Sequence, residues 1–332
     1  MAIIEKLLYQ SLEFLLYFII NTSYVILISP FLLTLIKKIK AFTQKRVGPP
    51  WFQGYYNLLK LFRKETVYSS TSSIIMRITP VFNLSIIIVA SLSVPILFIP
   101  SLQNTFGNVI LLIYLLALTK FFLALSGLDA GSTFGGMGSS REMTVLAVFE
   151  PIIILVFVAL VFIFRTTDIF EMFTISASCS NNIISSSQTC HYSFPLLIPI
   201  VISLFVMLIV ETARIPVDNP ETHLELTMIH EAMTLEQSGP NLAMLEISHG
   251  VKQTIIMALI INIIFPFGLA ISLNPFDLFI SFFAFTIKII VLSILVGIFE
   301  SSIAKFRLLR LPTLFSIALF LPVIAIGLSV FT

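Results

Sequence analysis

The sequence predicts an all-α integral membrane protein, and three observations support this prediction. Hydrophobic residues make up 58% of the 332-residue chain and charged residues only 11%, whereas soluble domains carry roughly 25% charged residues. The apolar residues gather in runs close to the ~20 residues that a helix needs to cross a bilayer. A helix pairs its backbone N–H and C=O groups within its own segment, as the hydrocarbon interior requires. We therefore expect a single transmembrane domain over residues 1–332.

About eight apolar runs are the expected membrane-spanning helices. They cover residues 12–36, 76–99, 107–128, 143–164, 194–213, 251–273, 277–300 and 311–331. The first run is too long for the apolar segment of a signal peptide and has no small-residue cleavage site, so we expect no cleavable leader. We find no repeated motif that would mark an inverted-repeat transporter.

Segment 49–64, "PPWFQGYYNLLKLFRK", predicts an amphipathic helix rather than a span, because it is too short and too polar to cross. Its apolar side chains recur every three or four residues. They are Trp51, Tyr55, Leu58, Leu59 and Phe62. Basic side chains lie off this stripe, which is typical of a helix at the cytoplasmic interface. Two interpretations remain open: a surface helix that only anchors, or a helix that forms the wall of a cavity or docks a partner.

The placement of Lys and Arg predicts the orientation, since these residues favour the cytoplasmic side. Fifteen of the 19 Lys and Arg residues lie in connections on one side of the predicted bundle. On the opposite side lie only Lys6 and Arg165. Both termini are therefore expected outside.

The outer loop at 165–193 contains "SASCSNNIISSSQTCH" and both cysteines of the chain. Because the outside is oxidising, a disulfide between Cys179 and Cys190 is one interpretation, and two unpaired thiols are the other. A metal site with His191 would have too few ligands. Two cysteines cannot hold an iron–sulfur cluster or a nickel–iron site by themselves. We therefore expect no metal and no cofactor in this chain.

An acidic cytoplasmic loop with a short helix is expected at 214–250, after the fifth run. The stretch "ETARIPVDNPETHLELTMIHEAM" holds four acids that we expect to face inward, beside Arg214. These acids are Glu211, Asp218, Glu221 and Glu225. Acids near one another raise each other's pKa, so one of them can titrate near neutral pH. The alternative is a solvated acidic face, which we favour for Glu236 and Glu246.

Further ionisable residues fall at or inside the apolar runs. Arg141, Glu142 and Glu150 lie around the entry to the fourth run. An ionised group inside the hydrocarbon costs several kcal/mol unless it is paired or neutral, so such residues are functional candidates. The alternative for Glu150 is a static pair with a basic residue. Lys120 and Lys288 lie within runs, where each could neutralise an acid or relay protons.

These motifs together resemble a known family. "ETARIPVDNPETHLELTMIHEAMTLEQSG" is similar to the signature of the membrane subunit shared by energy-converting group 4 nickel–iron hydrogenases and formate hydrogenlyase. It is more distantly similar to the H subunit of respiratory complex I. The pattern is carried here by Glu211, Arg214, Pro216, Asp218, Pro220 and Glu221. "RVGPP" at 46–50 and "SSREMTVLAVFEP" at 139–151 look like two other stretches of the family.

The resemblance implies a non-catalytic membrane subunit of a redox complex in a prokaryotic cell membrane. Such a subunit anchors a peripheral arm and couples its redox reaction to proton or sodium translocation. The implied partners are hydrogenase-like large and small subunits that carry nickel–iron and iron–sulfur centres, antiporter-like membrane subunits and the lipid bilayer, with no nucleic acid. The implied coupling residues are Glu211, Arg214, Asp218, Glu221, Glu225, Arg141, Glu142 and Glu150.

Other functions remain as alternatives. "THLELTMIHEAM" follows the hydrogenase wording, which favours reduction of protons or sulfur compounds and disfavours a quinone site. The alternative is a quinone-binding subunit of a complex I-type oxidoreductase. A stand-alone ion transporter should show internal symmetry, which is not found. A passive anchor has no need of ionisable residues inside the hydrocarbon.

Overall fold

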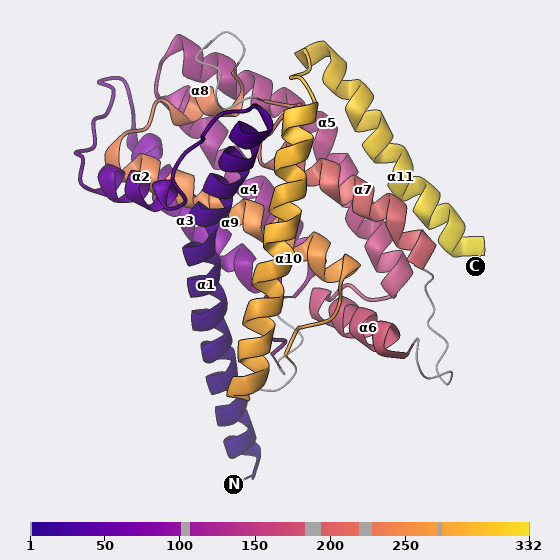
Figure 1. The fold of residues 1–332 in the computed structure, drawn as a ribbon. Helices are drawn as coiled ribbons and strands as arrows, with labels where there is room; N and C mark the ends of the chain where they lie inside the picture. Colours follow the sequence, from indigo (N-terminus) through magenta and orange to yellow (C-terminus); the bar gives the residue numbers. More distant parts are fainter. Residues whose placement is uncertain (1, 101–106, 183–193, 219–227, 271–273, 332) are drawn as a thin grey trace.

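The computed structural model describes residues 2–100, 107–182, 194–218, 228–270 and 274–331, which form a bundle of helices (Figure 1). The only β pairing in these ranges consists of isolated β-bridges, and turns and irregular segments connect the helices. The helices are α1 (Ala2–Thr43), α2 (Gln53–Phe62), α3 (Ile74–Leu92), α4 (Val109–Asp129), α5 (Thr133–Phe164), α6 (Ile169–Asn182), α7 (Phe194–Glu211), α8 (His230–Thr234), α9 (Gly239–Ile264), α10 (Pro275–Ser302) and α11 (Leu311–Phe331).

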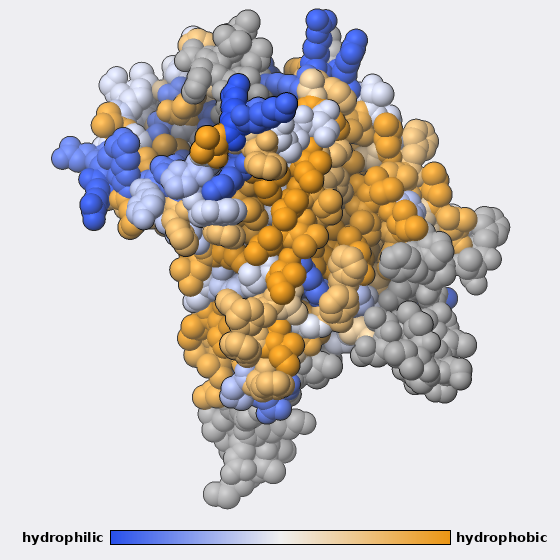
Figure 2. Space-filling model, in the orientation of Figure 1, coloured by the Kyte–Doolittle hydropathy of each residue, from blue (hydrophilic) through white to orange (hydrophobic). Residues whose placement is uncertain are grey.

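The expected membrane fold is confirmed, with a count close to the eight expected spans. Within the described ranges, seven helices are long and apolar enough to cross a membrane: α1, α3, α4, α5, α9, α10 and α11. The described part of α7 is apolar but shorter. Figure 2 shows apolar side chains over the body of the bundle and hydrophilic ones gathered at the end where α2 and α8 lie.

Short polar side chains begin several of these helices. The side chain of Ser73 accepts a hydrogen bond from the backbone N–H of Ile75 at the start of α3. Asn108 and Ser132 make the equivalent bonds at the starts of α4 and α5. Each cap satisfies one of the backbone donors that the first turn of a helix leaves unpaired.

α9 lies at the centre of the bundle, where it packs against α1, α2, α3, α7 and α10. In its most apolar window 83% of the residues are buried, compared with 28% in α11. A helix surrounded by other helices in this way is suited to carry polar residues that lipid would not tolerate.

Two helices extend further toward the basic end than the apolar runs predict. α5 begins at Thr133 rather than near residue 143, so Arg141 and Glu142 lie in the helix and not in a loop. α9 begins at Gly239 rather than near residue 251. Both extensions are polar or glycine-rich, and packing stabilises them: a Cβ on Gly138 of α5 would lie 2.9 Å from Cβ of Ala232 in α8. Tertiary contacts therefore override weak helix propensity here.

α3 and α9 are shorter at their carboxyl ends than the apolar runs 76–99 and 251–273 predict. α3 stops at Leu92 and α9 at Ile264. The following segments pair with each other, because the N–H of Ile99 donates to the carbonyl of Ala270 and that of Ala270 to the carbonyl of Leu97. Non-helical backbone at membrane depth needs such pairing.

Candidate functional site

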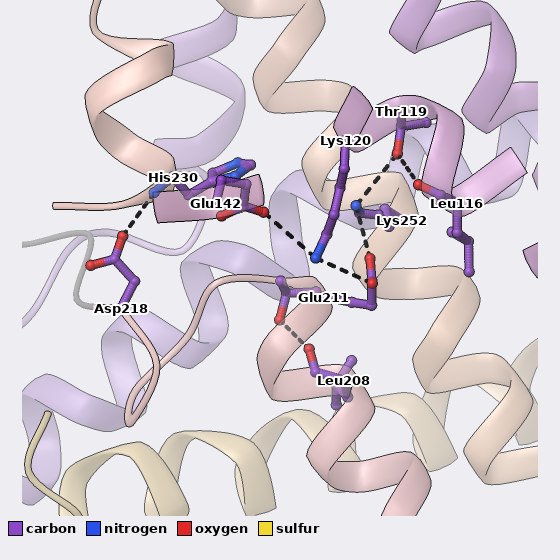
Figure 3. A network of polar contacts seen from close by, with 10 residues as sticks. Leu116, Thr119, Lys120, Glu142, Leu208, Glu211, Asp218, His230 and Lys252 are labelled. Atoms are coloured by element: carbon purple, nitrogen blue, oxygen red, sulfur yellow. Dashed lines mark hydrogen bonds and ion pairs between the residues drawn. The ribbon is translucent and has the colours of Figure 1, made fainter. Parts of the chain in front are cut away.

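Four charged side chains from four helices form a buried network at the basic end of the bundle (Figure 3). The Nζ of Lys120 in α4 lies 3.2 Å from Oε1 of Glu211 at the end of α7 and 3.6 Å from Oε1 of Glu142 in α5. The Nζ of Lys252 in α9 lies 3.1 Å from Oε2 of Glu211 and donates to Oγ1 of Thr119 at 3.5 Å. We call Lys120, Glu142, Glu211 and Lys252 the charge network.

The charge network is electrically balanced and almost wholly shielded from solvent. Its two ammonium groups face two carboxylates, and all four side chains are at most 7% exposed. Removing an ion from water costs several kcal/mol, which only close pairing offsets. Lys120 therefore has the neutralising role that was one expectation from the sequence.

Arg214 belongs to a second buried cluster. Its Nη1 lies 2.6 Å from Oε1 of Glu300 in α10, and its Nε and Nη2 donate to Oε1 of Gln253 at 3.2 and 2.6 Å. The expectation that Arg214 pairs with the acids of its own segment is therefore wrong for Glu211 and Asp218. The turn that follows α7 directs the guanidinium toward α9 and α10 instead.

Asp218 organises the start of α8. Its Oδ1 accepts from Nζ of Lys305 at 2.7 Å, and its Oδ2 accepts from the backbone N–H groups of Ile229 and His230 at 3.0 and 3.1 Å. The start of the short helix expected within 214–250 lies partly outside the described residues. In the described part of this segment, Asp218 binds the backbone eleven residues further on, at α8.

A cavity of about 250 Å³ lies against the charge network, between α1, α2, α3, α4 and α9. Lys120 and Lys252 line its inner part. Glu231, His230 and His249 line it as half-buried side chains, while Lys37 and Glu246 are exposed. Ionisable groups therefore continue from the solvent-exposed rim of the cavity to the buried lysines.

α2 forms one wall of this cavity. Gln53, Gly54, Asn57 and Leu58 line it, while Trp51 outside the helix is half exposed. A Cβ on Gly54 would lie only 2.5 Å from the carbonyl oxygen of Pro30 in α1, so glycine is required for this close packing.

Burial alters the protonation of the groups at α8. It raises the pKa of the Glu231 carboxyl to about 7; the Lys37 ammonium opposes this shift, and the carboxylates of Asp218 and Glu246 add to it. An acid with such a pKa exchanges protons at neutral pH.

Several expected site residues lie apart from the charge network. Arg141 donates to the backbone carbonyl of Met228 at 3.0 Å, which connects α5 to the segment before α8. Glu150 is half-buried, two turns deeper in α5. The Nζ of Lys288 donates to the carbonyls of Phe265 and Phe267, so it stabilises the non-helical segment that follows α9.

The structure tests some of the remaining expectations only partly. Glu221, Glu225 and Cys190 lie outside the described residues, as does the side chain of Cys179. Helix α6 occupies part of the expected outer loop. Across the described ranges, no group of three or more His, Cys, Asp or Glu side chains could hold a metal ion.

The sequence did not identify all members of the two clusters. Lys252, one of the fifteen charges that the sequence places in connections, lies well inside α9. Glu300, the last residue of the expected span at 277–300, pairs with Arg214. The signal that could have identified Lys252 is its position directly at the start of an apolar run. A helix that begins before such a run places the lysine inside the bundle, where its charge needs a partner.

A family model described as NADH dehydrogenase matches residues 15–332. The chain belongs to this family. The chain is 32% identical to hydrogenase-4 component C of Escherichia coli (strain K12), over 86% of each chain. It is 26% identical to formate hydrogenlyase subunit 4 of the same strain, over 88% of this chain and 91% of the relative.

The fold of this NADH dehydrogenase family member also has a solved counterpart. A chain in the structure of the membrane-bound sulfane sulfur reductase, described as an archaeal respiratory membrane complex, matches with a TM-score of 0.77 at 18% sequence identity. The match covers 95% of this chain and 99% of that chain. It shows a shared fold.

Proposed function

We propose that this chain is the membrane subunit of a respiratory redox complex, which anchors a peripheral electron-transfer arm and couples its reaction to proton or sodium translocation. The observation that carries the proposal is the charge network beside a cavity with titratable walls. A structural anchor gains nothing from four buried charges, because well-packed apolar side chains are often as stable or more so. The names of the relatives, a hydrogenase component and a formate hydrogenlyase subunit, support the same role.

The charge network suits coupling because its members compete for the same partners. Glu211 is shared by Lys120 and Lys252. If a redox step in a neighbouring subunit changes the charge near the cavity, the sharing of Glu211 shifts and one proton moves on or off a network side chain. The proposed electron carriers, nickel–iron and iron–sulfur centres, belong to partner subunits. Within the network Glu142 would balance Lys120, while Arg214 and Asp218 would hold the surrounding charges in place.

The proposed orientation places the basic end, with α2 and α8, in the cytoplasm of a prokaryotic cell and both termini outside. The peripheral arm would dock at this end. Figure 2 supports the proposal, since hydrophilic side chains gather there. A reporter active only in the periplasm, fused after Thr332, should be active; an inactive reporter on a chain that still assembles would reverse the orientation.

Isolation of the chain in a mild detergent tests the proposed function. An affinity tag on this chain should recover iron–sulfur-containing subunits and antiporter-like membrane subunits in fixed proportion. Recovery of the chain alone, together with ion flux in liposomes, would contradict the proposal and favour a stand-alone transporter.

A second candidate, a quinone-binding subunit, is favoured by one observation. The cavity between α1, α2 and α9 combines apolar side chains such as Leu58 with polar ones such as Asn57. Its volume of about 250 Å³ is below the roughly 300–1,000 Å³ of typical ligand pockets. Photolabelling of the isolated complex with a quinone carrying an azide would mark α2 if this candidate were correct.

A further inference from the structure

We propose that the imidazoles of His230 and His249 carry protons between the cavity and the charge network. This inference rests on the proposed function and specifies the entry route within it. Neither histidine belongs to the network, and neither has an ion pair in the described part of the chain. Both line the cavity, His230 from α8 and His249 from α9.

The two rings lie close together in the lining of the cavity. Their centroids are 5.5 Å apart, with an interplanar angle of 44°. The backbone N–H of His230 donates to Oδ2 of Asp218, which fixes the position of this residue (Figure 3). Its Nδ1 is buried and has no hydrogen-bond partner among the described residues. That nitrogen is therefore available to exchange a proton with a neighbour or with a water molecule.

Charged groups from several helices act on the pair. The groups that act electrostatically on His230 are Glu142 of α5, Lys120 of α4, Lys252 of α9 and Asp218. Those that act on His249 are Lys252, Arg214 and Lys37 of α1, together with His230 itself. The pair thus lies where the charge network, the Arg214 cluster and the exposed rim of the cavity meet.

The environment keeps the His230 ring suited to proton transfer. Burial lowers the pKa of its imidazole, Glu142 and Asp218 oppose this shift, and the ammonium groups of Lys252 and Lys120 add to it. A neutral imidazole carries one donor and one acceptor nitrogen. When a proton binds to the free nitrogen, the proton on the other nitrogen can leave, so that one N–H bond forms, one breaks and the ring returns to its neutral state.

The geometry also shows why a relay is useful. Glu142 and Glu211 do not line the cavity, so a proton from the rim reaches them only through an intervening group. Lys120 and Lys252 are already held by Glu211. Glu231, whose carboxyl titrates near neutral pH, is next to His230 in the chain and lines the same cavity. It would supply the proton to the pair.

The test uses the complete complex, isolated through a tag on this chain and reconstituted in vesicles. His230→Gln and His249→Gln should each lower the number of protons moved per redox turnover by about tenfold or more. Turnover with an artificial dye should continue. Added imidazole should restore part of the pumping in the smaller variants His230→Asn and His249→Asn. The control Glu65→Gln changes an exposed carboxylate outside the cavity and should pump normally.

The outcomes separate this inference from the proposed function. If the wild-type complex turns over but moves no ions, the proposed function fails. If the wild-type complex pumps and all four histidine variants pump with the same ratio, only the relay is wrong. Histidine variants that never assemble, as Gln or as Asn, would show a packing role and would also overturn the relay.

Discussion

Replacing Glu211 by Gln removes the carboxylate that two buried lysines share. Its oxygens lie 3.2 Å from Nζ of Lys120 and 3.1 Å from Nζ of Lys252. With an effective dielectric constant of about 20, each contact contributes roughly 5 kcal/mol of Coulomb attraction. Desolvation offsets most of this, so the expected net cost of removing one partner is about 3–5 kcal/mol. Among the described residues, only Glu142, 3.6 Å from Lys120, would remain to balance two ammonium groups.

Thermal unfolding of the purified complex in detergent measures this cost. We expect Glu211→Gln to lower the unfolding midpoint clearly, and Glu65→Gln, at an exposed carboxylate, to leave it unchanged. The double variant Glu211→Gln with Lys252→Met should be more stable than the sum of the two single changes predicts. In the double variant the Lys252 ammonium, which would be left without its carboxylate, is removed as well. A Glu211→Gln complex as stable as the wild type would refute the argument that the buried ions depend on one another.

Three other changes test further parts of the structure. Arg214→Lys should reduce assembly, because an ammonium does not reproduce the fork of bonds to the neighbouring amide and carboxylate; complex yield measures this. Gly54→Ala should push α2 away from α1 and shift the fluorescence of Trp51, the one tryptophan of the chain. In the control Gly136→Ala the added Cβ meets nothing within 4 Å, so the fluorescence of Trp51 should not change. The pKa of Glu231 is raised from 4.5 to about 7 in the folded protein. Below pH 4.5 the carboxyl is protonated in both the folded and the unfolded chain, so its burial does not affect stability. Above pH 7 the buried carboxylate reduces the free energy of unfolding by about 3 kcal/mol. Glu231→Gln should therefore raise the unfolding midpoint at pH 8 and not at pH 4, and an equal effect at both would count against the shift.

The sequence predicted the membrane fold because that prediction depends on composition and run length alone. Runs such as 311–331 correspond closely to a helix, α11. Helix ends were less predictable where tertiary contacts determine them. α5 continues through Gly135 and Gly138 because α4 and α8 pack against those glycines. α3 ends at Leu92 because its following segment pairs with residue 270, far away in the chain.

The site was predictable in its residue types and less so in its pairings. The sequence selected Glu211, Glu142 and Lys120 as ionisable residues near the membrane boundary, and the structure brings their side chains together. It assigned Arg214 to the wrong partner, because partners on α9 and α10 are distant in sequence. The arrangement of the spans around the bundle decides which charges meet. The apolar runs of the sequence show where each span lies in the chain, but not which spans are neighbours.

The ion-to-electron ratio of the reconstituted complex tests the central claim most directly. Lys120→Gln removes the ammonium that joins Glu142 to Glu211. We expect redox turnover with an artificial electron carrier to persist in this variant while the number of protons or sodium ions moved per electron pair falls well below the wild-type value. An unchanged ratio in a correctly assembled Lys120→Gln complex would show that ion movement does not pass through these buried charges.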